Sequence, residues 1–505
     1  MSLQKEELIK QFNTPILAIL KCSSLVKFGK NKRGNSIFPC QPIKYGLPPF
    51  RVASKNKDRK DKIVLIQYLD WTKNLPRGAI VSIIGNYGDI HAKQKGLINY
   101  YNIKPNKPKI KEIKEEINLE YEDKTDLEIF SIDPKGCLDI DDAMSCQVEE
   151  DRTIVGIHIA DVTRYLTKEL IEEKLQYQTS SLYPYNQSCI NLWGDKITKL
   201  ASLFPNEIRT SISLFFTIIE NEIKDVELKF LKIKSKRSFS YTEADTLVST
   251  YQPLKDLVNI TNLLNRNSLS DTKELVSFWM VEANKWIVKL MKRLNLPVIY
   301  RKHEETNILL ESIPQELLEL IKYRWMKGAE YTLEESEHYG LGIKGYTHFT
   351  SPIRRMTDTC IHWILKTKEN IINQKRLEMM NQMENRIKKY HIQQSIIEVL
   401  DIMNPEEELE AYVLDYDENG RIEIYIPRYK KFIKTYLFDT TIKNNTKISV
   451  ENDELKIENL LINEKEFLKL GEKIVIKIRE KKSFLPKNQF IVRIISKKMD
   501  KWFKI

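Results

Sequence analysis

The sequence predicts a multidomain α+β protein with a small β domain at each end and a mixed α/β domain between them. Its 505 residues correspond to about three domains at roughly 150 residues each. Short β-branched segments separated by turn residues gather near both ends, whereas strand-like and helical patterns mix in the middle. A hydrophobic content of 42% provides enough apolar side chains for buried cores and argues against wholesale disorder.

Residues 14–110 consist mainly of short segments with β character. The clearest are RVAS (51–54), KIVLIQYL (62–69) and AIVSIIG (79–85). Turn signals such as Pro48-Pro49 and Gly85-Asn86-Tyr87-Gly88 separate them, and short strands at this spacing predict a small barrel. Residues 104–126 are charged and contain two prolines, so we expect a linker that runs into a helix.

The central region contains both kinds of element, and the C-terminal region returns to β pattern. We expect strands at 155–162 and 211–219, an apolar helix at 274–294 and a long helix at 374–402. The C-terminal region has two strands across an Asp-Glu-Asn-Gly turn at 410–427 and further strands at 473–480 and 489–496. These last segments predict a second small β domain.

Several protein classes are excluded by what the sequence lacks. None of the six cysteines forms a Cys-x-x-Cys pair, which argues for reduced thiols in an intracellular protein and against a zinc ribbon. No run approaches about 18 apolar residues and the N-terminus does not resemble a signal peptide, so we expect a soluble protein without a membrane segment. The glycine-rich phosphate-binding motifs are absent, so we expect no nucleotide cofactor.

The positive charge is concentrated in the two flanking β regions. The formal net charge is +11. Residues 21–62 carry 12 Lys+Arg against 2 Asp+Glu, and residues 473–505 carry 11 against 2, so the rest of the chain is net acidic. A basic flank indicates a polyanionic partner such as nucleic acid.

The most informative segment holds four aspartates within ten residues, Asp133, Asp139, Asp141 and Asp142. Carboxylates held together repel one another unless a cation neutralises them. Oxygen-only ligands select hard cations such as Mg²⁺ or Mn²⁺, which also bind phosphate oxygens. Asp139 and Asp141 lie two residues apart, so an extended segment would direct both to one side.

Two other interpretations of this segment were weighed. A solvated acidic turn is as good an explanation for an isolated Asp-x-Asp-Asp, because charged residues are mostly exposed. A calcium-binding EF-hand loop starting at Asp139 would require Asp or Asn at position 143 and Gly at 144. Ala143 and Met144 stand there, so the calcium loop is rejected.

The segment DPKGCLDIDDA (133–143) resembles the signature of the RNB family, which comprises the ribonuclease II and ribonuclease R exoribonucleases and their exosome-associated relatives. Three further segments resemble family blocks in the same order: VGIHIADVTRYL (155–166), KSKRSFSYTEAD (234–245) and HYGLGIKGYTHFTSPIRRMTD (338–358). The resemblance implies a cold-shock-type OB barrel and linker at 1–112, an RNB catalytic domain at 113–402 and an OB-like RNA-binding domain at 403–505. It also implies a compact member without an N-terminal PIN nuclease module.

The resemblance implies a Mg²⁺-dependent hydrolytic exoribonuclease of the ribonuclease II type, with Mn²⁺ as a possible substitute. It would degrade single-stranded RNA from the 3′ end to 5′-mononucleotides. Carried over by position, the metal ligands are Asp133, Asp139, Asp141 and Asp142. The mechanism would be two-metal hydrolysis, in which one ion activates water and the other stabilises the leaving 3′ oxygen.

Residues 350–355 predict an anion-binding helix start. Ser351 suits an N-cap and Pro352 the first helical position, so free N–H groups would face a phosphate. The isolated pattern favours an Arg354–Asp358 surface pair, worth only about 0.3–0.5 kcal/mol. With the family resemblance we expect Arg354 to clamp a phosphate, with Arg355 as a second catalytic candidate.

RNA contacts are expected from Arg51, Lys55, Tyr183, Tyr185 and Ser351, since aromatic side chains stack on bases at about 1–3 kcal/mol each. We expect a monomer. The segment YQPLKDLVNITNLLNRNSLSD (251–271) is short where family members carry an RNA-stacking hairpin. This shortening supports an alternative, a catalytically weak or inactive RNA-binding regulator of the same fold. A metal protein unrelated to nucleic acid is the third class considered.

Overall fold

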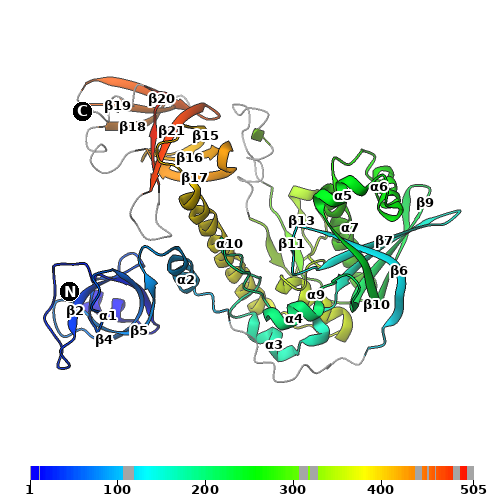
Figure 1. Cartoon of the computed structure of the whole chain (residues 1–505), viewed down its shortest axis with the longest axis horizontal. Coiled ribbons are helices and arrows are strands. Elements are labelled where there is room, and N and C mark those ends of the chain that lie inside the picture. The colour runs from blue at the N-terminus through cyan, green and yellow to red at the C-terminus, as the bar shows by residue number, and fades with distance from the viewer. Residues whose placement is uncertain are drawn as a thin grey trace.

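The computed structural model of the protein describes residues 2–10, 12–105, 119–305, 317–318, 328–437, 446–451, 454–460, 462–480 and 490–497. An N-terminal barrel, a larger central domain and a C-terminal β region form three distinct bodies, as Figure 1 shows. The long helix α10 (Gln374–Ile402) runs from the central domain to the C-terminal β region. Its first turn is capped by Asn373, whose side chain accepts a hydrogen bond from Arg376 N.

The N-terminal domain is a closed five-stranded barrel. Its strands are β1 (Ile16–Leu20), β2 (Ser36–Pro42), β3 (Phe50–Ser54), β4 (Lys62–Asp70) and β5 (Arg77–Asn86). The order β1-β2-β3-β5-β4 closes because β4 pairs antiparallel with β1, and this is the strand order of an OB fold. The predicted barrel is therefore confirmed.

Two helices flank this barrel, α1 (Ser2–Lys10) and α2 (Ile90–Tyr100). The interpretation of residues 14–110 as β segments was wrong for α2. Asp89 caps this helix, since its carboxylate accepts hydrogen bonds from His91 N at 2.8 Å and Ala92 N at 3.4 Å. The turn residues before position 89 thus start a helix instead of another strand.

The central domain is built on a second closed barrel in the order β10-β6-β7-β8-β9. Its strands are β6 (Glu122–Asp133), β7 (Asp142–Val148), β8 (Thr153–Ala160), β9 (Ile208–Ile219) and β10 (Glu222–Ser240). The barrel closes through the parallel pairing of β6 with β10. The helix expected to follow the linker is not found from Glu122 onward, where β6 begins, and residues 106–118 lie outside the described part of the chain.

Helices cover this barrel and complete the central domain. They are η1 (Val162–Tyr165), α3 (Lys168–Lys174), α4 (Gly194–Ala201), α5 (Tyr241–Leu247), α6 (Gln252–Asn265), α7 (Thr272–Arg293) and α9 (Met356–Thr367). Short elements β11 (Tyr300–Lys302), β12 (Glu330–Thr332), β13 (Glu337–His338), η2 (Tyr339–Leu341) and β14 (Ile343–Lys344) lie between α7 and α9. Strands and helices share one hydrophobic core, which includes Phe216 of the barrel and Trp279 of α7 in edge-to-face contact.

The C-terminal region repeats the OB strand order. The sheet β17-β16-β15-β21-β22 has the order of the first barrel opened between its third and fifth strands. Thr435 Oγ1 of β17 donates to Phe490 O of β22 at 3.0 Å, which joins the two open edges. The elements are β15 (Leu409–Tyr416), β16 (Arg421–Ile426), η3 (Pro427–Tyr429), β17 (Lys431–Tyr436), β21 (Lys473–Glu480) and β22 (Phe490–Ile494), with a separate sheet of β18 (Thr446–Glu451), β19 (Glu454–Asn459) and β20 (Glu464–Lys469). The second OB-type domain is confirmed.

The three parts contact one another through α2 and α10. A hydrophobic cluster joins Leu17 of the first barrel, Ala92 of α2, Leu182 of the central domain and Tyr390 of α10. Lys93 of α2 also forms an ion pair with Glu480 of β21 at 3.3 Å. The predicted domain boundaries stay predictions, although α10 ends at Ile402. Within the described ranges, no helix combines the length and apolarity that crossing a membrane requires.

Candidate active site

The four aspartates lie at one rim of the central barrel. Strand β6 ends at Asp133 and strand β7 begins at Asp142, so the intervening turn carries the other two. Neighbouring strands fix both ends of this turn, because Ser240 of β10 is in register with Asp133 and Ile159 of β8 with Asp142. The barrel therefore brings the cluster to the place where four strands end or begin.

Burial and mutual repulsion shape the protonation of the cluster. Asp141 is 2% exposed, and burial raises its pKa well above the ordinary value. Burial raises the pKa of Asp133 to about 6, with the charge of Asp139 as a further cause. Burial and the charge of Asp133 raise the pKa of Asp142 to about 7. Three carboxylates are thus held in surroundings that disfavour their charged form.

Two of the buried carboxylate oxygens have no hydrogen-bond donor. Asp133 Oδ2 and Asp141 Oδ2 both lack one, although Asp141 Oδ1 accepts from Ile353 N at 2.8 Å. Buried oxygens without donors are costly, and an all-oxygen set of this kind fits a hard cation such as Mg²⁺ or Mn²⁺. Within the described residues, no group of three or more His, Cys, Asp or Glu is already close enough to hold a metal. The aspartates would therefore have to converge further around an ion.

Arg354 is the positive charge beside the aspartates. Its Nε lies 3.3 Å from Asp141 Oδ2, and its Nη2 donates to Ser351 Oγ at 3.0 Å. The Arg354 side chain is 46% exposed, so the guanidinium also faces solvent. Its charge opposes the effect of burial on the pKa values of Asp133, Asp141 and Asp142.

Arg355 occupies a different position. Its Nη2 donates to Asp358 Oδ1 at 2.8 Å, and the Asp358 side chain is fully buried. The surface pair considered for Arg354 with Asp358 is therefore made by Arg355 instead, three residues away. This contact gives Arg355 a structural partner, and its catalytic assignment stays a prediction.

The predicted start of the following helix was wrong. Helix α9 begins at Met356 with Arg355 at its N-cap position, so Ser351 and Pro352 lie in the preceding turn. Two backbone amides of this turn are also engaged, because Ser351 N donates to Asp358 Oδ1 at 2.7 Å and Ile353 N donates to Asp141 Oδ1 at 2.8 Å. The turn therefore binds carboxylates of the protein itself instead of presenting free N–H groups to a phosphate. Ser351 is 3% exposed, and its predicted RNA contact stays a prediction.

Among the four expected RNA-contact residues outside this turn, the structure brings Tyr183 to the aspartates. Its hydroxyl donates to Asp139 Oδ2 at 3.0 Å, and its side chain is 44% exposed. Tyr185 instead donates to Asp401 of α10 at 3.1 Å. Arg51 and Lys55 lie on the N-terminal barrel, where Arg51 Nε donates to Leu75 O at 3.2 Å and Lys55 is exposed.

Sequence reasoning missed some neighbours of the cluster. Cys137 Sγ donates to Asp139 Oδ1 at 3.4 Å, and the ring of His391 lies 5.9 Å from that of Tyr183. His391 comes from α10, more than 200 residues further along the chain, and a single histidine on a polar helix carries no recognisable signal. Cys137 lies inside the aspartate motif, where the sequence pattern gives it no role of its own.

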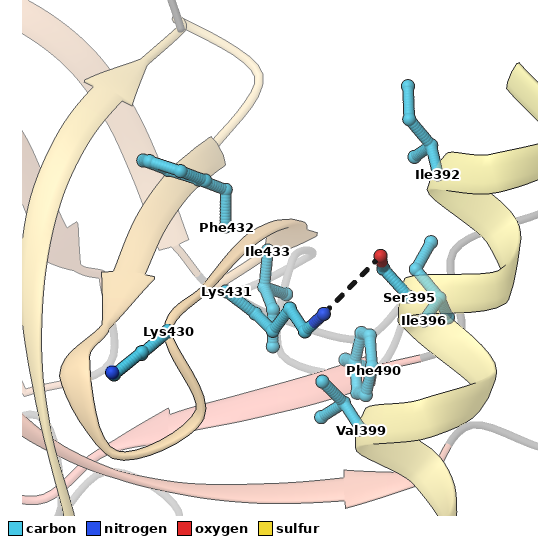
Figure 2. Close-up of a pocket in the computed structure, with 9 residues that line it drawn as sticks. All are labelled: Ile392, Ser395, Ile396, Val399, Lys430, Lys431, Phe432, Ile433 and Phe490. Carbon is cyan, nitrogen blue, oxygen red and sulfur yellow. Dashed lines mark hydrogen bonds between the residues drawn. The ribbon is translucent and has the colours of Figure 1, made fainter. Parts of the chain in front are cut away.

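Two adjoining cavities form a groove along α10 that ends at the C-terminal β region. One cavity of about 420 Å³ is lined by Ser180 and by α10 residues including Lys388 and His391. A second cavity of about 280 Å³ shares Ile392 and Ser395 with it and continues to strand β17. Figure 2 shows Lys431 reaching from β17 across this second cavity to Ser395 of α10.

An RNB-type barrel between two OB-type domains defines the class of protein. The RNB domain family matches residues 121–272 and 254–370, and the Dis3-like cold-shock domain 2 family matches residues 38–102. The chain belongs to the RNB family, with a Dis3-like cold-shock domain before its catalytic-type domain.

Known relatives agree with this assignment. Ribonuclease R of Aquifex aeolicus is 24% identical over 435 residues, which cover 67% of this chain and 62% of the relative, so the chain spans less than two thirds of that protein. The solved structure of Mycoplasma genitalium RNase R with ribose-methylated single-stranded RNA matches 95% of this chain and 90% of that one, at a TM-score of 0.75 and 17% identity. Yeast Ssd1, described as a pseudonuclease, matches 91% and 81% at a TM-score of 0.67 and 14% identity.

Proposed function

We propose that this protein is a metal-dependent 3′→5′ exoribonuclease that hydrolyses single-stranded RNA to 5′-mononucleotides. The observation that supports it best is the aspartate cluster, in which two buried carboxylate oxygens lack donors while an exposed guanidinium stands beside them. Such an arrangement suits a cation and a phosphate together. The similarity to ribonuclease R and the bound RNA in a relative of the same fold support the substrate class.

Asp133, Asp139, Asp141 and Asp142 would hold the Mg²⁺ or Mn²⁺ ions. Ions bound there supply an activated water and stabilise the leaving 3′ oxygen. Arg354 has the exposed donors needed to bind a non-bridging phosphate oxygen by charge-assisted hydrogen bonds. Tyr183 orients Asp139 through its hydroxyl, and its exposed ring offers a stacking face for a base.

The groove along α10 offers a route by which a single strand reaches this site. It carries Lys388 at its Ser180 end and Lys430 at the C-terminal β region, where Lys431 is paired with Glu398 at 2.6 Å. Cations spaced along a channel follow a phosphate backbone without reading its sequence.

The direct test uses 5′-labelled single-stranded RNA, Mg²⁺ and the full-length protein. We expect a ladder that shortens from the 3′ end, release of 5′-mononucleotides, and survival of DNA of the same sequence. Asp142→Asn should abolish cleavage while RNA binding persists, whereas Asp151→Asn, a matched change in an exposed turn, should leave cleavage unchanged. EDTA should stop the reaction, and Mg²⁺ or Mn²⁺ should restore it. Intact RNA with the unmodified protein under these conditions refutes the proposal.

The second candidate is an RNA-binding protein of the same fold without turnover. Two observations favour it: the fold match includes a pseudonuclease, and the aspartates do not form a ready metal site. It predicts tight RNA binding that is unchanged by EDTA, with no product in the cleavage assay. Binding that falls steeply with salt would still separate it from a metal protein unrelated to nucleic acid.

A further inference from the structure

A basic cavity of about 410 Å³ lies on the central domain, outside the aspartate cluster and the α10 groove. It is formed by the C-terminal half of α7 and the turns around β14. Its lining consists of Lys285, Val288, Lys289, Lys292, Glu335, Gly342, Ile343, Lys344 and Gly345. Four lysines therefore surround one glutamate.

The lysines are arranged on one face. Lys285, Lys289 and Lys292 recur at i, i+4 and i+7 on α7, which places them in a row about 10 Å long. Lys344 belongs to the opposite wall, on β14. Gly342 beside it has a φ of +62°, and a side chain added there would meet open space, so a ligand can approach the backbone closely.

Half of this positive charge is already neutralised. Glu282 binds Lys285 through both carboxylate oxygens at 2.8 and 3.1 Å, and Glu335 binds Lys292 at 2.6 Å. Among the described residues, no carboxylate forms an ion pair with Lys289 or Lys344.

Lys289 is held in a setting that suits an added anion. Its Nζ lies 3.8 Å from the centre of the Trp286 ring. Burial and the neighbouring positive charge of Lys285 lower the pKa of Lys289. A bound anion would relieve this repulsion, so the cavity has spare positive charge, concave shape and room for a ligand.

We propose that this cavity is an accessory site for the phosphate backbone of an RNA strand. The inference rests on the proposed function for the identity of the polyanion. Lysine ammonium groups rotate to meet phosphate oxygens as point charges, without demanding one geometry or base sequence. Since RNA is the substrate under the proposed function, the occupant is a run of phosphates in RNA.

Helix α7 connects this cavity to the segment that leads to Arg354. Asn284, next to Lys285 on α7, donates to Tyr346 OH at 3.0 Å and accepts from Phe349 N at 2.7 Å. The same stretch of α7 thus supports both the cavity and the segment that leads to Arg354. RNA held here remains tethered to the catalytic domain, which raises its effective concentration at the aspartates.

The test measures RNA binding by the full-length protein in EDTA, across a series of salt concentrations, so that cleavage plays no part. The variant is Lys289→Glu with Lys344→Glu. The matched control is Lys232→Glu with Lys255→Glu, two exposed lysines of the same domain. The slope of the logarithm of the binding constant against the logarithm of the salt concentration is the measured quantity, called the salt slope. Two lost phosphate contacts should reduce the salt slope by about 1.4 and weaken binding about 25-fold at 0.1 M salt. An unchanged slope and affinity, or an equal loss in the control, would overturn the proposal.

Lysine acetylation followed by mass spectrometry identifies the occupant. RNA should protect Lys289 and Lys344, whereas AMP and polyglutamate at equal charge should not. Equal protection by AMP would assign the cavity to a mononucleotide, and stronger protection by polyglutamate would assign it to an acidic protein, so either outcome contradicts an RNA site. If the unmodified protein neither binds nor cleaves RNA, the proposed function fails; if it cleaves RNA and only the footprint is absent, the accessory site alone fails.

Discussion

The buried ion pair between Asp161 and Lys366 ties the two halves of the candidate site together, and we predict that removing its cation destabilises the central domain. Lys366 Nζ lies 2.8 Å from Asp161 Oδ2, and both side chains are fully buried. Tyr121 and Thr163 also donate to the Asp161 carboxylate. Asp161 directly follows β8, where Ala160 N donates to Asp141 O, and Lys366 lies on α9.

Replacement of Lys366 by methionine keeps most of the volume but leaves a buried carboxylate without its cation. Loss of one partner of such a pair costs about 3–5 kcal/mol. At about 2–4 °C per kcal/mol for a domain of this size, the melting temperature of the central domain should fall by about 6–20 °C. Differential scanning calorimetry at pH 7 measures this shift, with exposed Lys375→Met as the matched control.

The pH dependence supplies an independent check. In the unmodified protein, Lys366 and the hydrogen bonds to the carboxylate lower the pKa of Asp161 despite burial. A lowered pKa contributes stability that is present above the unfolded value of about 3.9 and is lost as the pH falls through the folded value. Without Lys366, burial raises the pKa of Asp161, so its carboxyl group destabilises the folded protein as the pH rises. The difference in the free energy of unfolding between the unmodified protein and Lys366→Met should therefore widen from pH 4 to pH 7.

The double variant Asp161→Asn with Lys366→Met separates charge from packing. Replacing both members of a buried pair is often nearly neutral, so it should recover most of the lost stability. A single variant that melts within 2 °C of the unmodified protein, or a double variant no more stable than the single one, would refute the reasoning.

Three further predictions concern RNA. Arg354→Ala should slow single-turnover cleavage about 10- to 100-fold, because a charge-assisted hydrogen bond is worth about 1.5–3 kcal/mol. Arg354→Lys should recover only part of the lost rate, and an unchanged rate in Arg354→Ala contradicts a phosphate contact. Tyr183→Phe should keep base stacking but remove the hydrogen bond to Asp139. The Mg²⁺ concentration for half-maximal cleavage should then rise while RNA affinity stays constant. A drop in RNA affinity without a change in the Mg²⁺ requirement would contradict this role. Lys55→Glu should lower the salt slope of RNA binding by about 0.7 and leave the cleavage rate at saturating RNA unchanged, and an unchanged slope would remove this residue from the interface.

The sequence revealed those parts of the site that are contiguous in the chain. The four aspartates fall within ten residues, so the cluster could be predicted from a local pattern. Of the central barrel, only the strands at 155–162 and 211–219 were expected; β6 and β7 were not, and β6 begins inside the segment expected to be a linker. The contact between Arg354 and Asp141 joins residues more than 200 positions apart. Only the family resemblance indicated it, because no local pattern encodes which distant segment a closed barrel brings to its rim.

The misplaced start of α9 has a physical cause, which is competition for the backbone amides of the preceding turn. Ser351-Pro352 has the composition of a helix start, but Asp141 and Asp358 accept the amide hydrogens that a helix start would leave free. One acceptor from a distant segment and one from the first turn of α9 thus accompany a helix that begins at Met356. The preference for an N-cap is worth only about 1 kcal/mol, so two buried carboxylates outweigh it.

The contacts of Arg354 explain how the aspartate cluster persists before a cation binds. Burial raises the pKa values of Asp133, Asp141 and Asp142. Arg355 lowers the pKa of Asp142, and the Arg354 guanidinium lowers all three. Because the side chain is half exposed and Asp141 keeps its second contact to Ile353 N, Arg354 can turn to a phosphate without leaving Asp141 unsupported. A cation held by the cluster would take over the charge balance, and the guanidinium would then have free donors for a phosphate. Metal and RNA would in this way favour each other's binding, since each removes a reason for Arg354 to stay on Asp141.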